Sequence, residues 1–156
     1  MDIKKTANSF ANFTIKRIAE IFGLTVFCAG ALLLLALISY SPEDPNFIFP
    51  ENTKIENILG FQGSFVSDIF FQSIGLVSYF FSFTLIITGI NIIRSKEFFL
   101  IIENIFFAII YSLLGTLFFA HFYSEAFTLY INGNGGFIGA YLNQSFLNSI
   151  FLINEV

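Results

Sequence analysis

The sequence predicts an all-α, polytopic transmembrane helical domain. Hydrophobic residues make up 56% of the chain and charged residues 12%, with a mean hydropathy of +0.79, whereas about 25% of the residues in soluble domains are charged. Three apolar runs, at about 21–40, 72–93 and 98–122, are each long enough to cross the ~30 Å hydrocarbon core of a bilayer as a helix. We therefore expect a membrane domain over residues 21–122 with three spans.

The first run, IFGLTVFCAGALLLLALISY, contains no charged residue. It ends at Ser41-Pro42-Glu43-Asp44-Pro45, where two prolines three residues apart cannot continue a helix. Its single cysteine, Cys28, is the only one in the chain, so no intramolecular disulfide can form. The acidic residues of the following loop and its boundary form either a partner-docking surface or a solvated loop: Glu43, Asp44, Glu51, Glu56 and Asp68.

The second run starts between Ile69 and Ile74 and ends near Ile93. It carries small residues that allow close helix packing in lipid, namely Ser78, Ser82, Thr84, Thr88 and Gly89. A charged turn at residues 94–97 separates it from the third run.

The basic residues predict the orientation. Six of the seven lie before the first helix or in the 94–97 turn, and only Lys54 falls on the other side. Because cytoplasmic loops are enriched in Lys and Arg, we expect a cytoplasmic N-terminal segment, residues 1–20, and two periplasmic loops. Residues 1–20 form either a short helix on the membrane surface, with its lysines toward anionic headgroups, or a disordered tail.

A short motif occurs twice. Residues 60–66 (GFQGSFV) and 136–142 (GFIGAYL) share the pattern G-F-x-G-small-aromatic-aliphatic, and each follows an outward-going helix. The second copy lies within residues 123–156, a periplasmic, Gly-rich segment in which we expect an amphipathic surface helix. Its apolar stripe consists of Phe137, Tyr141, Leu142, Phe146 and Ile150. The repeat leads us to expect a fourth span, and hence that the sequence is part of a longer chain.

Nucleotide, nucleic-acid and metal sites are not indicated. No G-x-x-x-x-G-K-[ST] is present, so we expect the repeated glycines to serve packing. The net charge of −4 argues against a nucleic-acid surface. For His121, the only histidine, we expect an interfacial contact with Glu125 rather than a metal or proton-relay role, and for Glu103 snorkelling or pairing with Arg94 or Lys96.

These motifs resemble one known family. The segment 36–47, ALISYSPEDPNF, resembles the L-x-S-Y-S-P-x-D-P-x-[WF] signature that closes the first helix of the FtsK/SpoIIIE-type DNA translocases. The segments 60–68 and 135–139 resemble that family's G-x-x-G-x-x-x-x-D and G-G-x-x-G segments. The candidate signature residues are Ser39, Tyr40, Ser41, Pro42, Asp44, Pro45, Gly60, Gly63, Asp68, Gly135, Gly136 and Gly139.

The resemblance implies the four-helix N-terminal membrane domain of such a translocase, with three of the four spans present here. It implies an inner-membrane anchor at the division septum, assembled as a homo-oligomer (a hexamer), that contacts the lipid bilayer and other cell-division membrane proteins. It also implies a tethered cytoplasmic ATPase that pumps double-stranded DNA. That motor, with its ATP and Mg²⁺, is absent from this sequence, so we expect no catalysis and no cofactor in this chain.

Two other interpretations remain open. A small inner-membrane transporter or channel subunit would need buried ionisable residues along a path, and only Glu103 and His121 are candidates. A truncated, unstable gene product without a function is the second.

Overall fold

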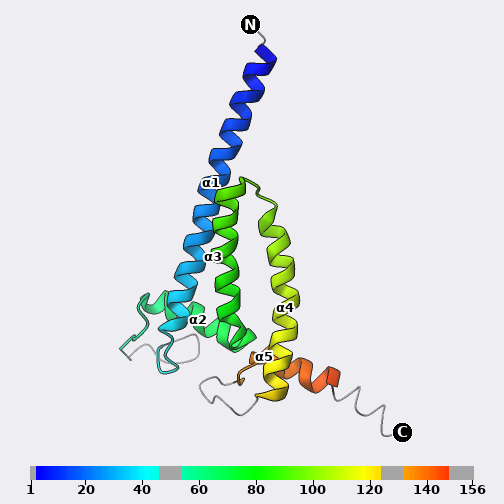
Figure 1. The fold of residues 1–156 in the computed structure, drawn as a ribbon. Coiled ribbons are helices and arrows are strands. Elements are labelled where there is room, and N and C mark those ends of the chain that lie inside the picture. The colour runs from blue at the N-terminus through cyan, green and yellow to red at the C-terminus, as the bar shows by residue number, and fades with distance from the viewer. Residues whose placement is uncertain (1–2, 46–53, 124–131, 148–156) are drawn as a thin grey trace, which may run out of the picture.

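The computed structural model describes residues 3–45, 54–123 and 132–147, and every regular element in these ranges is a helix. In Figure 1 the long helices α1, α3 and α4 run side by side, and the shorter α2 and α5 lie across one end. We call that end the loop end, and the opposite end, with the turn between α3 and α4, the turn end. The elements in order are α1 (Ile3–Ile38), α2 (Gly60–Ile74), α3 (Val77–Ser95), α4 (Leu100–Phe122), α5 (Gly136–Leu142) and the π-helical turn η1 (Asn143–Leu147).

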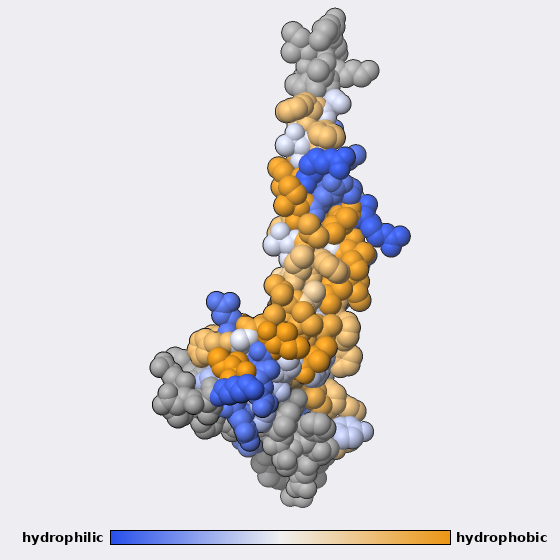
Figure 2. All heavy atoms as spheres, turned by 90° about the vertical axis from the view of Figure 1, so that its left-hand side faces the viewer, coloured by the Kyte–Doolittle hydropathy of each residue, from blue (hydrophilic) through white to orange (hydrophobic). Residues whose placement is uncertain are grey.

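The predicted class and its three spans are confirmed. Within the described residues, three helical stretches are long and apolar enough to cross a membrane: Asn8–Ile38, Val77–Ser95 and Leu100–Phe122. The surface shows the same organisation. In Figure 2, hydrophilic residues gather at the loop end and near the turn end, and a hydrophobic band lies between them.

The first helix is longer than predicted. α1 runs without interruption from Ile3 to Ile38, so residues 3–20 are neither a separate surface helix nor a disordered tail. The sequence offers no reason for a break, because no glycine or proline occurs between Ile3 and Gly23. The helix ends two residues before the predicted Tyr40.

The second apolar run is divided between two helices. α2 ends at Ile74 and α3 begins at Val77, so the predicted span of about 72–93 begins later and residues 72–74 belong to α2. Gly75 between them has φ +58°, a conformation that no helix interior can contain. The third span begins at Leu100, two residues after the predicted 98, and ends at the predicted Phe122.

α1 and α3 pack backbone to backbone. A Cβ added to Gly89 would lie 2.4 Å from the Phe27 nitrogen, one added to Gly23 2.9 Å from the Gly89 oxygen, and one added to Gly30 2.8 Å from the Ile86 nitrogen. The prediction that small residues of this span allow close packing is therefore confirmed. Three of its hydroxyl residues are buried as well, namely Ser78, Ser82 and Thr88.

α4 is joined to α3 by small and polar residues. The Asn104 amide donates to Thr88 Oγ1 at 2.9 Å, and the hydroxyls of Thr84 and Tyr111 lie 2.7 Å apart. The buried face of α4 recurs every four residues, at Ala108, Ser112, Thr116 and Ala120. Its large side chains point outward, as expected of a helix that contacts lipid.

An ion-pair cluster ties α1 to the turn end. Glu20 accepts from Arg17 at 2.5 Å and from Lys96 at 2.6 Å. Lys96 also closes α3 in a left-handed conformation, with φ +63°. Within the described ranges Glu103 is exposed and has no ion pair, while the Lys96 ammonium pairs with Glu20. Of the two expectations for Glu103, pairing with Arg94 or Lys96 is therefore wrong, and snorkelling stays a prediction.

Candidate functional site

The signature residues meet at the loop end, in two groups. One group lies around the α1–α2 loop and contains Tyr40, Asp44, Gly63 and Asp68. The other begins α5 and contacts α4. The first group is called here the loop clasp and consists of Ser39, Tyr40, Asp44, Asn57, Gly63 and Asp68.

Asp44 fixes the path of the loop. Its carboxylate is almost fully buried, at 1% exposure, and accepts from the backbone N–H of Glu56 at 2.7 Å and of Asn57 at 3.0 Å. A buried carboxylate is tolerated only where it is fully hydrogen-bonded. The prolines on either side, Pro42 and Pro45, stop the chain from continuing as helix and so place this carboxylate in the loop.

Asn57 connects the loop to both neighbouring helices. Its amide donates to the Ala36 carbonyl near the end of α1 at 2.9 Å, and its Oδ1 accepts from the Leu59 N–H at 3.0 Å. Gly63 leaves room for this side chain, because a Cβ there would lie 2.1 Å from Asn57 Oδ1. Gly60 begins α2 with φ +65°. The second glycine of the motif before the second span thus makes room for an asparagine.

Tyr40 and Asp68 join the end of α1 to the middle of α2. The Tyr40 hydroxyl donates to Asp68 Oδ1 at 3.2 Å, and the Tyr40 ring packs on Phe71 with ring centroids 4.9 Å apart. Phe71 is fully buried and also contacts Tyr79 of α3. Asp68 therefore has a structural contact that the sequence motif alone does not specify.

The remaining residues of the first signature have smaller contacts. Ser39 Oγ accepts from the Ile58 N–H at 3.2 Å and donates to the Leu35 carbonyl at 2.7 Å. The Ser41 carbonyl accepts from the Asp44 N–H at 3.3 Å. The last two signature positions, Asn46 and Phe47, and the acidic Glu51 lie outside the described residues.

The second group packs α5 onto α4. A Cβ on either Gly135 or Gly139 would lie 2.4 Å from the Thr116 carbonyl oxygen, so both glycines allow close approach to the α4 backbone. Gly136 begins α5 with φ +63°, and a Cβ there would lie 2.6 Å from the Gly75 nitrogen. The glycines of the second motif are thus in contact with two other segments of backbone.

The two groups form one unit through the break between α2 and α3. The Leu76 N–H donates to the Asn134 carbonyl at 2.9 Å, and the Asn132 amide donates to Gln72 Oε1 at 3.1 Å. The Asn134 amide also donates to the Tyr123 carbonyl at 2.7 Å. The ends of α1, α3 and α4 are therefore held together by α2 and α5.

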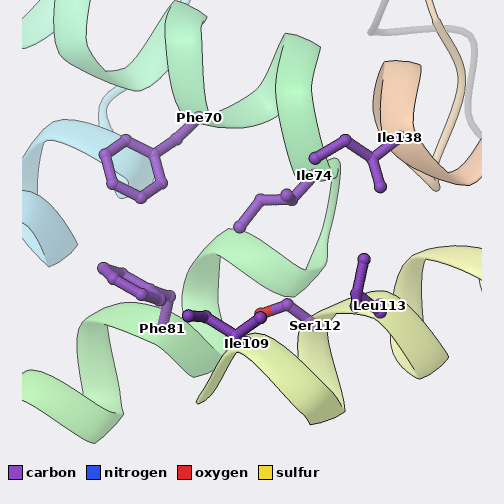
Figure 3. A pocket seen from close by; sticks show the side chains of 7 residues that line it. All are labelled: Phe70, Ile74, Phe81, Ile109, Ser112, Leu113 and Ile138. Atoms are coloured by element: carbon purple, nitrogen blue, oxygen red, sulfur yellow. The ribbon is translucent and has the colours of Figure 1, made fainter. Parts of the chain in front are cut away.

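A small apolar pocket lies between α2, α3, α4 and α5. It measures about 200 Å³, and Figure 3 shows side chains of α2, α3, α4 and α5 converging on it. No lining residue is ionisable, and the buried Ser112 Oγ has no hydrogen-bond partner among the described residues. The lining consists of Phe70, Ile74, Phe81, Ile109, Ser112, Leu113 and Ile138.

The two other candidate residues do not meet in space. Glu103 and His121 lie near opposite ends of α4, about 27 Å apart along a helix at 1.5 Å per residue. His121 Nδ1 lies 3.2 Å from Asn143 Oδ1, while its predicted partner Glu125 is outside the described residues. The described part of the chain contains no group of three or more metal-ligating side chains.

Several structural residues were not identified from the sequence. Asn57, Gly75, Asn134 and the Glu20–Lys96 pair all hold segments that are distant in sequence. The glycine at 75, inside an apolar run, was a usable signal for a helix break. Asn57 gave none, because its importance depends on the α1 carbonyl that it meets.

Comparison with known proteins agrees with this architecture. The chain matches the family described as the 4TM region of DNA translocase FtsK/SpoIIIE over residues 15–152. It is 31% identical over 78 residues to DNA translocase FtsK of Rhizobium meliloti, 35% over 79 residues to that of Caulobacter vibrioides, and 32% over 69 residues to that of Azospirillum brasilense.

These alignments cover 43–51% of this chain but only 9–11% of the relatives, so the chain corresponds to a small part of each of them. No solved structure matches this chain significantly. The family match includes the first span from residue 15 on, the other two spans whole, the loop clasp and the α4–α5 contact. The chain therefore belongs to the family of membrane domains, the 4TM region, of the FtsK/SpoIIIE DNA translocases.

Proposed function

We propose that this chain is the membrane anchor of a DNA translocase that acts in bacterial cell division and chromosome segregation. The observation that carries the proposal is the family match over residues 15–152, which contains the three spans and the loop-end residues that hold them together. The anchor works by binding, without catalysis in this chain. ATP, Mg²⁺ and DNA are bound by the motor of the whole protein.

The N-terminus of the anchor lies in the cytoplasm and the loop end faces the periplasm of the inner membrane. The distribution of charge supports this orientation. Lys16, Arg17, Arg94 and Lys96 lie at or near the turn end, whereas the loop end carries one basic residue, Lys54. Basic residues favour the cytoplasmic side, which supports a cytoplasmic turn end.

The anchor assembles as a homo-oligomer, a hexamer that matches the motor, and contacts other division proteins at the septum. Exposed acidic side chains at the loop end, Glu43 and Glu56, supply a polar docking surface there. Chemical cross-linking in native membranes is expected to give a ladder of bands that ends at the hexamer. A monomer at every cross-linker concentration would contradict this assembly.

Localisation tests the proposal directly. A fluorescent protein joined to the N-terminus of this chain is expected to collect as a band at mid-cell in dividing bacteria. The Asp44→Ala variant is the matched control, because it removes the hydrogen bonds of the loop clasp and leaves the sequence of all three spans unchanged. An even distribution of the unaltered chain around the cell membrane would overturn the proposed septal role.

Orientation requires a separate measurement. The exposed Cys28 is first replaced by serine, and single cysteines are then introduced at Glu56 and Glu97. A membrane-impermeant maleimide added to intact spheroplasts is expected to label position 56 and not position 97. The reverse labelling pattern would contradict the proposed orientation but would not affect the family assignment.

A further inference from the structure

The two short helices present matching pairs of aromatic rings. Phe61 and Phe65 of α2 stack with centroids 6.3 Å apart and an interplanar angle of 22°. Phe137 and Tyr141 of α5 stack at 6.3 Å and 21°. Each pair is spaced four residues apart, so both rings lie on one face of the helix. The sequence repeat thus builds the same aromatic display twice.

Three of the four rings are exposed, Phe65 is half-buried, and neither face carries a charge. Phe61 is 50% exposed, Phe137 61% and Tyr141 62%, and on α2 the stripe continues to Ile69 at 46%. Asp68 is the only charged residue of α2 and is buried, and residues 132–147 contain none. A helix face that meets water normally carries charged side chains. The two aromatic faces are therefore poorly suited to water.

The other side of each helix is fixed to the bundle. α2 buries Ser64, Ser67 and Phe71 as well as Asp68, and α5 buries Gly139 against Thr116. Figure 1 shows both helices lying across the loop end of the three spans. The spans also expose apolar side chains, such as Phe83 and Phe118, as expected of helices that cross a membrane.

We propose that α2 and α5 are a pair of interfacial helices whose four rings insert into the glycerol and headgroup region of the phospholipid leaflet at the loop end. Aromatic rings prefer this region of a bilayer, and helices with one apolar face lie in its plane. Two such helices on different sides of the bundle set the depth of the domain and resist its tilting. The partner is the lipid surface itself.

The absence of tryptophan from this chain makes the proposal directly measurable. Phe61→Trp and Phe137→Trp each introduce a single fluorophore into the whole chain, reconstituted in phosphatidylcholine vesicles. Lipids brominated close to the glycerol backbone are expected to quench both variants more strongly than lipids brominated near the chain ends. Both emission maxima are expected to lie to the blue of that of tryptophan in water.

Two reference variants calibrate depth. Phe107→Trp, on the exposed face of α4 and four residues before its midpoint, is expected to be quenched most by the deep bromines, and Glu43→Trp by aqueous iodide. Deep quenching of Phe107→Trp also shows that the domain has inserted. Three results at positions 61 and 137 would overturn the proposal: quenching by iodide alone, strongest quenching by deep bromines, or blue-shifted emission that neither quencher reduces, which would indicate burial against a second protein.

Discussion

α2 and α5 begin in the same way and use their second glycine differently. Both start at a glycine with positive φ, Gly60 at +65° and Gly136 at +63°. Three residues on, Gly63 leaves room for a side chain of its own loop, Asn57, whereas Gly139 leaves room for the backbone of another span at Thr116. The same motif thus allows a contact within one loop in the first half of the chain and a contact between two helices in the second half.

The difference teaches which contact makes each glycine necessary. A side chain can move to a new rotamer, or a substitution can shorten it, and either change relieves a clash. A backbone carbonyl inside a helix cannot move away without disrupting that helix. We therefore expect the second copy of the motif to tolerate substitution less well than the first.

The largest difference in the free energy of unfolding is expected between Gly136→Ala and Gly60→Ala. Both variants place a Cβ on a left-handed residue, at a cost of about 1–2 kcal/mol. Only at position 136 does the Cβ meet backbone, 2.6 Å from the Gly75 nitrogen and the Ser73 oxygen, while nothing lies within 4 Å at position 60. Overpacking adds about 1–3 kcal/mol there. Unfolding by SDS in mixed micelles should separate the two, and equal losses would contradict the comparison.

The next largest effect on stability is expected when substitutions of Gly63 and Gly139 are combined with a second substitution at the residue whose atoms they meet. Gly63→Ala and Gly139→Ala are each expected to destabilise the domain by about 1–3 kcal/mol through overpacking. Asn57→Ala should partly rescue Gly63→Ala because it removes the amide oxygen that the new Cβ would meet, although the Leu59 Cβ remains 2.5 Å away. Thr116→Ala should not rescue Gly139→Ala, since the clash is with a carbonyl. Double-mutant cycles measure both couplings, and additive behaviour at 57 and 63 would refute the local interpretation.

A smaller effect is expected from Asp44, which stabilises the first loop and has no counterpart in α5. Asp44→Ala leaves the amides of Glu56 and Asn57 without their acceptor, at a cost of about 2 kcal/mol. Asp44→Asn keeps one acceptor oxygen and should cost less. Disulfide trapping between cysteines at His121 and Asn143, with Cys28 replaced by serine, should proceed equally in both variants, because the contact of α4 with the segment that follows α5 does not involve this loop. Slower trapping would show that the two ends of the repeat are coupled.

The smallest effect is expected for Tyr40→Phe. The variant removes the hydroxyl that donates to Asp68 at 3.2 Å but keeps the ring contact with Phe71. A single hydrogen bond of this kind contributes about 1 kcal/mol. The same SDS titration should show a modest shift for Tyr40→Phe and a clearly larger one for Tyr40→Ala, and equal shifts would mean that the ring contributes nothing.

Much of this architecture follows from local sequence properties. The apolar runs specify three spans because hydrocarbon requires a length and excludes charge. The prolines at 42 and 45 specify the end of the first helix. The small residues of the second span lie in close helix contacts. Each of these inferences needs only a residue and its neighbours along the chain.

One helix boundary and one ion pair that the sequence did not predict correctly depend instead on contacts between distant segments. Gly75 is itself a local signal for a break, but its close packing depends on Asn134, whose carbonyl would lie 1.9 Å from a Cβ there and accepts from the Leu76 N–H. The choice of Glu20 over Glu103 as the partner of Lys96 depends on the packing of α1 against α3. In each case the deciding atom lies far away along the chain.

By itself, the sequence determined that this protein spans a membrane with three helices, where the first of them ends, and which family it resembles. Tertiary structure alone decided why the signature residues matter: Asp44 holds the amides at 56 and 57, Gly63 accommodates Asn57, and Gly135 and Gly139 admit the backbone of α4. The physical reason is that hydrophobicity and helix breaking are properties of single residues, whereas a close contact is a property of two surfaces that meet only after the chain has folded.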